Sequence, residues 1–466
     1  MNIVIVGGGT AGWLTAYSLA KLTSHEITVI ESSDVPIIGA GEGSTGALTD
    51  FLTGQWCPLD FTIEEFIENT KATTKLGIVH KNWKGDGTQY MAPLDGSPTD
   101  QCTPDKALIA QIISDRDKFH TCSYLGFSYE NNLRDKLGSF HFDAFLVGNF
   151  LKKKLLEKNE VTIVDAVVDE ILTDDKGYIK TLIGKNLNLS ADFFIDCTGF
   201  KRLLINKVGG KWHSYQKHLP VNRALAFQKP LENNYEQVTY AHALKNGWVW
   251  KIPTQERYGC GYVFSDAYTT RDNAYKEIVE HYGNVDILRE FSFDTGRQEK
   301  VWINNCLSLG LSSSFAEPLE ATSIHTTLIQ LVKFLFEYLE ETQELTCNQK
   351  RINYYNKSMN KMYDDIKDFL VLHYMGGRTD SEFWRAITNK ETTTEFVEYI
   401  IDMSQSGRMI SPLTFASFYD GMVGSTLYKW ILIGLGIFNP GNIDIKNIDF
   451  DFEINELNGI KEQWSF

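Results

Sequence analysis

The chain has 466 residues, of which 43% are hydrophobic and 23% charged, and this predicts a globular protein with two or three packed modules. The formal net charge of −15 argues against a nucleic-acid partner, which would need a basic face, and against binding to an anionic membrane surface. Seven cysteines without CxxC spacing favour reduced thiols in a cytoplasmic protein over a disulfide framework or a zinc site, and we expect no metal.

A strand, a glycine-rich turn and a helix open the chain. The β-branched run 3–6 leads into Gly7-Gly8-Gly9-Thr10-Ala11-Gly12, and an apolar helical pattern follows from residue 13. In this pattern the first glycine allows the tight turn, the second lets the backbone approach a pyrophosphate, and the third lets the helix pack against the strand. Free N–H groups at the helix start would face the phosphates. The segment therefore predicts a dinucleotide-binding βαβ unit; a loop that only turns is the alternative.

Two further features follow this unit. A second strand, 27–30, ends in Glu31, close to the ~20-residue offset at which an acid binds the ribose 2′-hydroxyl. The segment 35–45 then collects glycines around Ala40, Gly41 and Glu42, which predicts a loop whose backbone lies against a flat ligand.

The middle of the chain mixes helix and strand signals. Residues 61–83 predict a helix and then a strand that carries Lys75 among apolar neighbours. Lysines are usually solvated, so a surface position is the alternative, whereas burial would lower the lysine pKa and make the amine nucleophilic. A helix is expected over 141–158, and short strands at 161–172 and 178–189. Asp196, at the end of a further hydrophobic strand, is interpreted as structural.

The second half alternates in strand fashion over 221–265 and is helical and aromatic from about 348. Between these parts, a buried strand at 301–311 runs into a serine-rich loop, and a long helix follows. Glu320 lies at the start of that helix, where a carboxylate is favourable for dipole reasons alone. The longest apolar run, 430–438, is too short to span a bilayer, and the N-terminal apolar run is expected to be a strand rather than a signal peptide.

Taken together, several motifs resemble those of flavin-dependent halogenases of the tryptophan-halogenase type, in the same order and over most of the chain. The matching segments are Gly7 to Trp13, Gly39-Ala40-Gly41-Glu42, Lys75 to Trp83, Phe194 to Gly199, Trp248-x-Trp250-x-Ile252-Pro253, Glu317-Pro318-Leu319-Glu320 and 363–384. The Trp-x-Trp-x-Ile-Pro element is the most specific of them. In the family its tryptophans are thought to block direct hydroxylation of the substrate by the flavin.

The resemblance implies an α/β fold of the FAD-dependent monooxygenase (glutathione-reductase) type, with an inserted β-rich substrate module and a helical C-terminal part. The FAD-binding module would comprise 1–85, 151–205 and 301–345, the substrate module 86–150 and 206–300, and the aromatic-rich pocket part 346–466. Besides the glycine turn, Glu31 and the 40–42 loop, the resemblance implies Leu311 and Ile324 as cofactor contacts. Trp248, Trp250, Ile252 and Pro253 would pack on the flavin side.

The chemistry implied by the resemblance uses FADH2, dioxygen and a halide ion, which is chloride, bromide or iodide, to form hypohalous acid. Lys75 would relay the hypohalous acid and Glu320 would assist, so that an electron-rich aromatic or indole-type substrate is halogenated. The N–H groups of Thr322 and Ser323 would bind the halide. The family normally has Glu-Ser-Thr-Gly where this chain has Glu320-Ala321-Thr322-Ser323. Because a non-glycine restricts φ and adds a side chain, we expect bromide or iodide to be used more efficiently than chloride.

Substrate and partners are less specified. Family members that bind free tryptophan often carry Tyr-His-Pro-Phe where this chain has 90–94, Tyr-Met-Ala-Pro-Leu, so free tryptophan is not the expected substrate. A single dinucleotide motif predicts that a separate NAD(P)H-dependent flavin reductase supplies FADH2. The other partner is a small aromatic substrate, and a homodimer is left open. A flavin-dependent aromatic hydroxylase and a non-catalytic FAD-binding relative are the alternative functions.

Overall fold

The computed structural model describes residues 1–34, 42–75, 77–93, 139–233, 235–339, 348–389, 391–406, 423 and 425–438. The chain forms two compact units, each built from three separate segments. The first unit comprises Met1–Thr73, Phe142–Tyr215 and Phe293–Tyr363, and the second comprises Thr74–His141, Gln216–Ser292 and Asp364–Phe466. The assignment of segments to cofactor and substrate modules stays a prediction.

The first unit is built on a six-stranded sheet in the order β20-β21-β12-β1-β2-β8. Its strands are β1 (Asn2–Val6), β2 (Glu26–Glu31), β8 (Thr162–Asp165), β12 (Phe193–Asp196), β20 (Trp302–Ile303) and β21 (Cys306–Ser308). Neighbouring strands are parallel except for the β20–β21 hairpin. The central strand β1 is apolar and buried, as a parallel strand covered on both faces should be. The dinucleotide-binding α/β fold predicted from the first 31 residues is confirmed.

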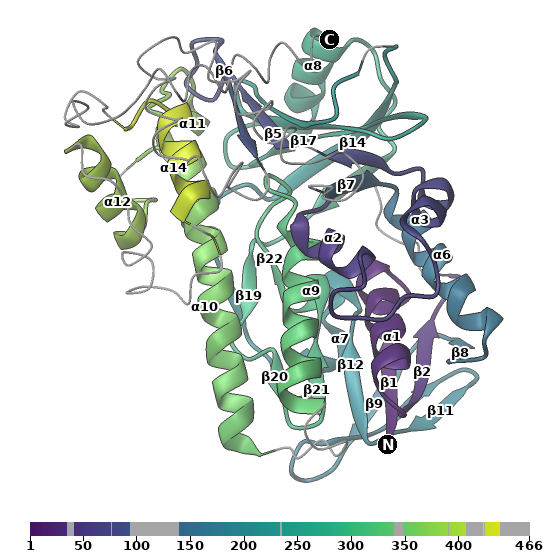
Figure 1. Ribbon diagram of the computed structural model, residues 1–466. Helices are drawn as coiled ribbons and strands as arrows, with labels where there is room; N and C mark the ends of the chain where they lie inside the picture. The colour runs from purple at the N-terminus through teal and green to yellow at the C-terminus, as the bar shows by residue number, and fades with distance from the viewer. Residues whose placement is uncertain are drawn as a thin grey trace, which may run out of the picture. The chain divides into compact units, whose positions relative to one another are not determined.

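Helices α1 (Thr10–Leu22) and α9 (Thr322–Phe334) lie side by side against this sheet (Figure 1). Stacked and edge-on aromatic rings, among them Phe193, Trp302 and Phe334, fill the space beneath α9. The other helical segments of the unit are α2 (Gly46–Leu52), α3 (Ile63–Thr70), α6 (Ala144–Glu157), α7 (Leu203–Lys207), the 3-10 turns Gly199–Lys201 and Gly310–Ser312, and a π-helical turn at Leu335–Leu339.

Short strands complete the first unit. They are β3 (Glu42–Gly43), the antiparallel set β9 (Glu170–Thr173), β10 (Ile179–Gly184) and β11 (Leu187–Ser190), and the set β13 (Trp212–Ser214), β19 (Gly296–Gln298) and β22 (Ser314–Phe315). The strand regions predicted at 161–172 and 178–189 thus resolve into β8, β9, β10 and β11.

Two sequence-based boundaries are wrong. The single strand predicted at 301–311 is a hairpin, because Asn304 turns the chain with a left-handed φ of 51°. The helix predicted from residue 141 begins at Ala144, because Ser139–Phe142 forms β7 and Asp143 caps the helix by accepting hydrogen bonds from the N–H groups of Phe145 and Leu146.

The second unit contains a seven-stranded sheet in the order β18-β14-β17-β16-β15-β5-β6. Its strands are β5 (Gly77–Lys81), β6 (Gln89–Pro93), β14 (Arg223–Pro230), β15 (Thr239–Ala243), β16 (Gly247–Pro253), β17 (Arg257–Phe264) and β18 (Arg289–Ser292). The alternating pattern over 221–265 therefore forms the middle of this sheet, as predicted. Helix α8 (Arg271–Tyr282) packs on β17 through Ala274 and Ile278.

Helices form the last described part of the chain. Helix α10 (Gln349–His373) carries the chain from the first unit into the second, and α11 (Glu382–Ile387), α12 (Glu395–Gln405) and α14 (Ser425–Gly434) follow. The short strand β4 (Thr73–Lys75) runs beside β7. Among the described residues, no helix combines the length and apolar character needed to cross a bilayer.

Candidate functional site

The glycine turn between β1 and α1 has the backbone of a phosphate-binding loop. Gly7 adopts a φ of 119°, and a side chain there would collide with the Cys197 carbonyl. Nothing among the described residues lies within 4 Å of the place where a Cβ on Gly9 would be, so the helix start is open to a ligand. Gly9 caps α1 without a side-chain hydrogen bond, which leaves the first N–H groups of the helix for an anion.

Glu31, at the end of β2, lies against this turn. A Cβ on Gly8 would be 2.5 Å from Oε2 of Glu31, so the carboxylate packs directly on the glycine backbone. Oε1 forms an ion pair with Lys152 of α6. An acid at this position can accept hydrogen bonds from ribose hydroxyls. The turn and Glu31 together therefore fit the adenosine and pyrophosphate part of a dinucleotide.

The other predicted cofactor residues are distributed over the same unit. Gly310, before Leu311, approaches the turn so closely that a Cβ on it would be 2.7 Å from the Cβ of Ala11. Ile324 is buried in the first turn of α9. Ala40 and Gly41 lie outside the described residues, and Glu42 begins β3. The cofactor roles of these residues stay predictions.

Asp196 binds the ends of several segments to one another. Its carboxylate accepts hydrogen bonds from the N–H and hydroxyl groups of Thr198, from the N–H groups of Leu204 and Ile205, and from Ser312 Oγ. A carboxylate with this many donors is held for structural reasons, as the sequence indicates.

The loop before α9 carries Glu320. Ala321, the next residue, has a left-handed φ of 53° and donates its N–H to the Pro318 carbonyl at 3.1 Å. Thr322 and Ser323 are the first two residues of α9, so their N–H groups belong to the unpaired helix start. Because Ser323 has an ordinary helical backbone, the φ restriction that we expected at this position falls on Ala321 instead.

One turn further, His325 is held by a hydrogen bond between its Nδ1 and Thr45 Oγ1 (2.8 Å). Burial lowers the pKa of His325 to about 4, so the ring is neutral near pH 7. His325 is therefore a packed residue of the helix.

Lys75, in the second unit, is fully buried, as the apolar neighbours in the sequence predict. His141, on the adjacent strand β7, is also fully buried and forms a 2.8 Å hydrogen bond with Thr239 Oγ1. Burial, and then the positive charge of Lys75, hold the pKa of His141 well below its usual value. Lys81, by contrast, is exposed at the end of β5. Of Lys71, Lys75 and Lys81, only Lys75 is therefore buried in the protein interior.

The Trp-x-Trp-x-Ile-Pro element forms β16 of the second unit. Trp248 is 1% exposed and donates its indole N–H to the Tyr374 hydroxyl at 3.0 Å. Trp250, Ile252 and Pro253 are buried as well. This stretch is an interior strand, and its expected place beside a flavin stays a prediction.

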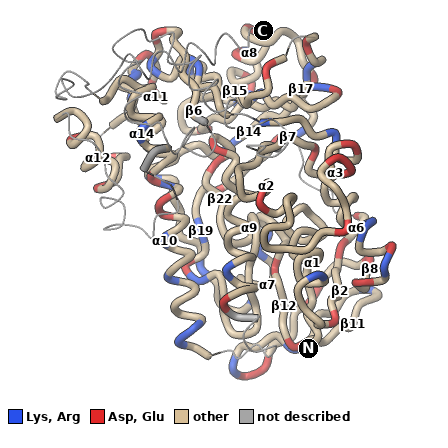
Figure 2. Tube along the Cα trace, in the orientation of Figure 1, with Lys and Arg blue, Asp and Glu red and all other residues tan. Residues whose placement is uncertain are grey.

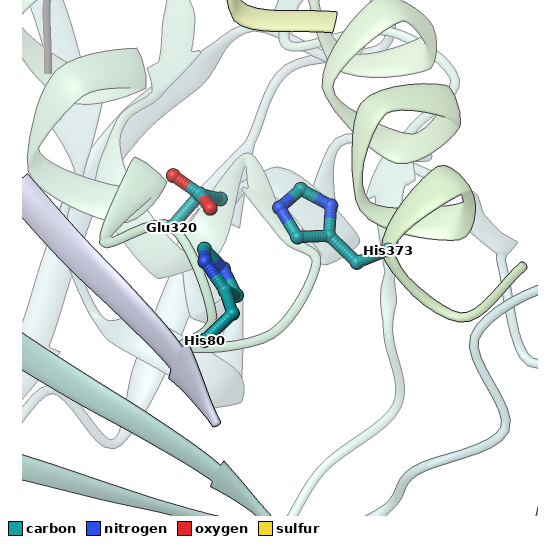
Figure 3. Close-up of side chains that lie close together, drawn as sticks. All are labelled: His80, Glu320 and His373. Atoms are coloured by element: carbon teal, nitrogen blue, oxygen red, sulfur yellow. The ribbon is translucent and has the colours of Figure 1, made fainter. Parts of the chain in front are cut away.

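Two buried histidines of the second unit were missed by the sequence analysis. The side chains of His80 and His373 lie close together (Figure 3), with ring centroids 5.0 Å apart. The ring of His80 also stacks on Tyr90 at a centroid distance of 4.8 Å. His373 Nδ1 is 2.8 Å from the Phe369 carbonyl, so this nitrogen is the hydrogen-bond donor. Figure 3 also labels Glu320, which belongs to the first unit. His80 lies inside the apolar run 76–83, and this position in the sequence could have indicated a buried histidine.

Such a histidine pair can pass a proton or provide nitrogen ligands to a transition metal. The expectation that the protein holds no metal therefore stays a prediction.

Known proteins match the chain over nearly its whole length. A family model described as tryptophan halogenase matches residues 2–443. Tryptophan 7-halogenase RebH of Lentzea aerocolonigenes is 32% identical over 489 residues, which cover 94% of this chain and 89% of the relative. The crystal structure of tryptophan 6-halogenase SttH from Streptomyces toxytricini is similar with a TM-score of 0.87, at 26% identity and covering 99% of this chain and 96% of the other. Xcc4156, a flavin-dependent halogenase from Xanthomonas campestris, gives a TM-score of 0.85 at 28% identity, covering 99% and 94%.

With the dinucleotide-binding fold and the glycine turn, these relatives define an FADH2-dependent enzyme of the flavin-dependent halogenase class. The chain belongs to the tryptophan halogenase family, as the motifs predict.

Proposed function

We propose that the protein halogenates an electron-rich aromatic or indole-type substrate, with FADH2, dioxygen and a halide ion as co-substrates. The observation that supports this best is the complete burial of Lys75, within the segment that carries the lysine motif of the family. A lysine without such a role would rarely be fully buried, because desolvation of an ammonium group is unfavourable.

The first unit would hold the cofactor. The glycine turn 7–12 and Glu31 would bind its adenosine and pyrophosphate, and Leu311 and Ile324 would contact it further along. Bound reduced FAD supplies the electrons with which dioxygen and a halide ion give hypohalous acid. The N–H groups of Thr322 and Ser323 would bind the halide at the start of α9, where the helix dipole favours an anion.

Lys75 would act after hypohalous acid has formed. Lys75 would react as the free amine, because an ammonium group has no lone pair to offer to the halogen. A neutral amine either hydrogen-bonds the hypohalous acid or forms an N–halogen bond while the halogen–oxygen bond breaks and water leaves. The aromatic ring then attacks the halogen and the bonding pair stays on the amine nitrogen; Glu320 accepts the proton that the ring loses, and one proton returns to the nitrogen to restore the amine. His141 lies beside Lys75, and its low pKa keeps it from adding a positive charge next to the amine.

The proposal is tested with purified protein, FAD, NADH, a separate flavin reductase and a panel of indoles and phenols, in chloride or bromide. Mass spectrometry should detect a product with the isotope pattern of one added halogen, and only when halide is present. A product that gains oxygen without halide dependence would identify the hydroxylase instead. Absence of any product across the panel would favour the non-catalytic relative.

The need for a reductase is tested in the same assay. We expect no product when NADH and FAD are supplied without the reductase, because the sequence carries a single dinucleotide motif. Rapid NADH consumption by the protein alone would contradict this partner.

A further inference from the structure

Helix α6 crosses the glycine turn along one face. Ala144, Gly148 and Lys152 are spaced by four residues, so they lie above one another on the helix. The Ala144 carbonyl accepts a hydrogen bond from Thr10 Oγ1 at 3.3 Å. A Cβ on Gly148 would be 3.2 Å from Cδ1 of Trp13, so only a very small residue lets the helix come this close. The first two residues of this face bring the third, Lys152, to the turn.

Lys152 lies one helical turn beyond and reaches the acid at the end of β2. Its Nζ forms an ion pair with Oε1 of Glu31 and lies 5.7 Å from the ring centroid of Trp13, within range of a cation–π interaction. The other carboxylate oxygen of Glu31 lies against the backbone of Gly8. Asp165 is the register partner of Glu31 on β8, and the charge of Lys152 contributes, after the hydrogen bonds from Ser33, to a lowered Asp165 pKa.

Basic and acidic segments accordingly lie next to one another around α6, β2 and β8 in Figure 2. One lysine therefore pairs with Glu31 and contributes positive charge at Asp165, close to the glycine turn where a dinucleotide would present its ribose and pyrophosphate. The pyrophosphate is an anion, so without Lys152 it would meet two negative charges in a chain whose formal charge is already −15.

An ordinary surface ion pair would not explain this arrangement. Lys153, the next residue, forms such a pair with Glu157 of the same helix at 3.9 Å, with side chains that are 68% and 52% exposed. The pair of Lys152 and Glu31 is 31% and 20% exposed and joins elements that are 121 residues apart. The helix carries both kinds of lysine side by side, which provides a matched control.

We propose that Lys152 is a positioning residue of the FAD site: it holds the Glu31 carboxylate toward the ribose hydroxyls and offsets the negative charge of Glu31 and Asp165 near the pyrophosphate. This inference rests on the proposed function, namely that the first unit binds FAD.

Flavin fluorescence titrations of the wild type, Lys152→Gln, Lys152→Arg and Lys153→Gln measure the dissociation constant for FAD. We expect Lys152→Gln to raise the dissociation constant for FAD about tenfold, which is the size of one charge-assisted interaction. Lys152→Arg should restore most of the lost affinity. Lys153→Gln should leave the dissociation constant unchanged. The affinity for ADP, measured in competition with FAD, should fall by the same factor, because ADP carries only the adenosine and the pyrophosphate. In a Glu31→Gln background, Lys152→Gln should cost no more than about twofold, since the lysine acts largely through that carboxylate.

Equal affinities of Lys152→Gln and Lys153→Gln for FAD would overturn the inference. A lower melting temperature of Lys152→Gln with unchanged FAD and ADP affinities would also overturn it, because the ion pair would then only stabilise the fold. Failure of all four proteins, including the wild type, to bind FAD would refute the proposed function itself and with it this inference.

Discussion

Lys75→Met replaces the buried amine of β4 by an uncharged chain of similar length. Lys75 is fully buried, and methionine is an uncharged side chain of similar length that needs no solvation in this interior. His141 should stay neutral, because burial, the largest cause of its low pKa, remains when the charge of Lys75 is removed. The variant should therefore fold and differ mainly in its chemistry.

We expect product formation to fall by about 10²–10⁴-fold, the range for removal of a group that acts directly in a reaction. The FAD dissociation constant should change by less than about twofold, because the residues proposed to bind FAD belong to the first unit and Lys75 to the second. Oxidation of FADH2 by dioxygen should continue, since Lys75 acts only after the hypohalous acid has formed.

The assay follows halogenated product by mass spectrometry and oxygen consumption in the same reaction. Lys81→Met is the matched control, because Lys81 lies on β5, the next strand along the chain, with an exposed side chain. Unimpaired product formation by Lys75→Met would remove this residue from the mechanism. Equal losses in both variants would show that the activity depends on charge in this region rather than on the buried amine.

Three further predictions concern stability and specificity. Trp248→Ala should lower the free energy of unfolding by ~3–5 kcal/mol in denaturant titrations, because a buried indole bonded to Tyr374 is lost; a loss as large in Trp248→Phe would contradict this reason. Ser323→Gly removes the side chain beside the proposed halide position and should shift product ratios toward chloride in competition with bromide; a wild-type preference for chloride would refute this argument. Burial raises the pKa of Asp365 from 3.8 to about 7, so the folded state binds the proton more tightly and this group's contribution to stability should fall as the pH rises from about 4 to about 7. Asp365→Asn should reduce this decrease of stability with pH, as measured by urea midpoints at several pH values. If the pH dependence of stability is unchanged in the variant, other groups cause it.

Local patterns were enough to predict the start of the chain. Strand β1, helix α1 and strand β2 agree with the sequence because a β-branched run, a glycine turn and a helical apolar period each act within a few residues. The burial of Lys75 was predictable for the same reason, since its apolar neighbours are adjacent in the sequence.

Contacts between distant segments could not be predicted in this way. Nothing near Glu31 indicates that Lys152 binds it, because the two residues are 121 positions apart and meet only once α6 has packed on α1. The pairing of β21 with β12 and the approach of His80 to His373 likewise depend on tertiary packing. The strand β7 was missed because its apolar residues directly precede those of α6 and continue their helical pattern.

The interleaving of the two units has a consequence for synthesis on the ribosome. The sheet of the first unit receives β1 and β2 from the first 31 residues, but β12 comes only at 193–196 and β21 only at 306–308. Until β21 has emerged, β12 has only one of its two neighbours, and its unpaired edge can join another nascent chain. A chain stopped at residue 292, the last boundary before this segment, should therefore be aggregation-prone in vivo although it contains all strands of the second unit's large sheet. High-level expression should then depend on chaperones that hold an incomplete sheet while its last strands are translated.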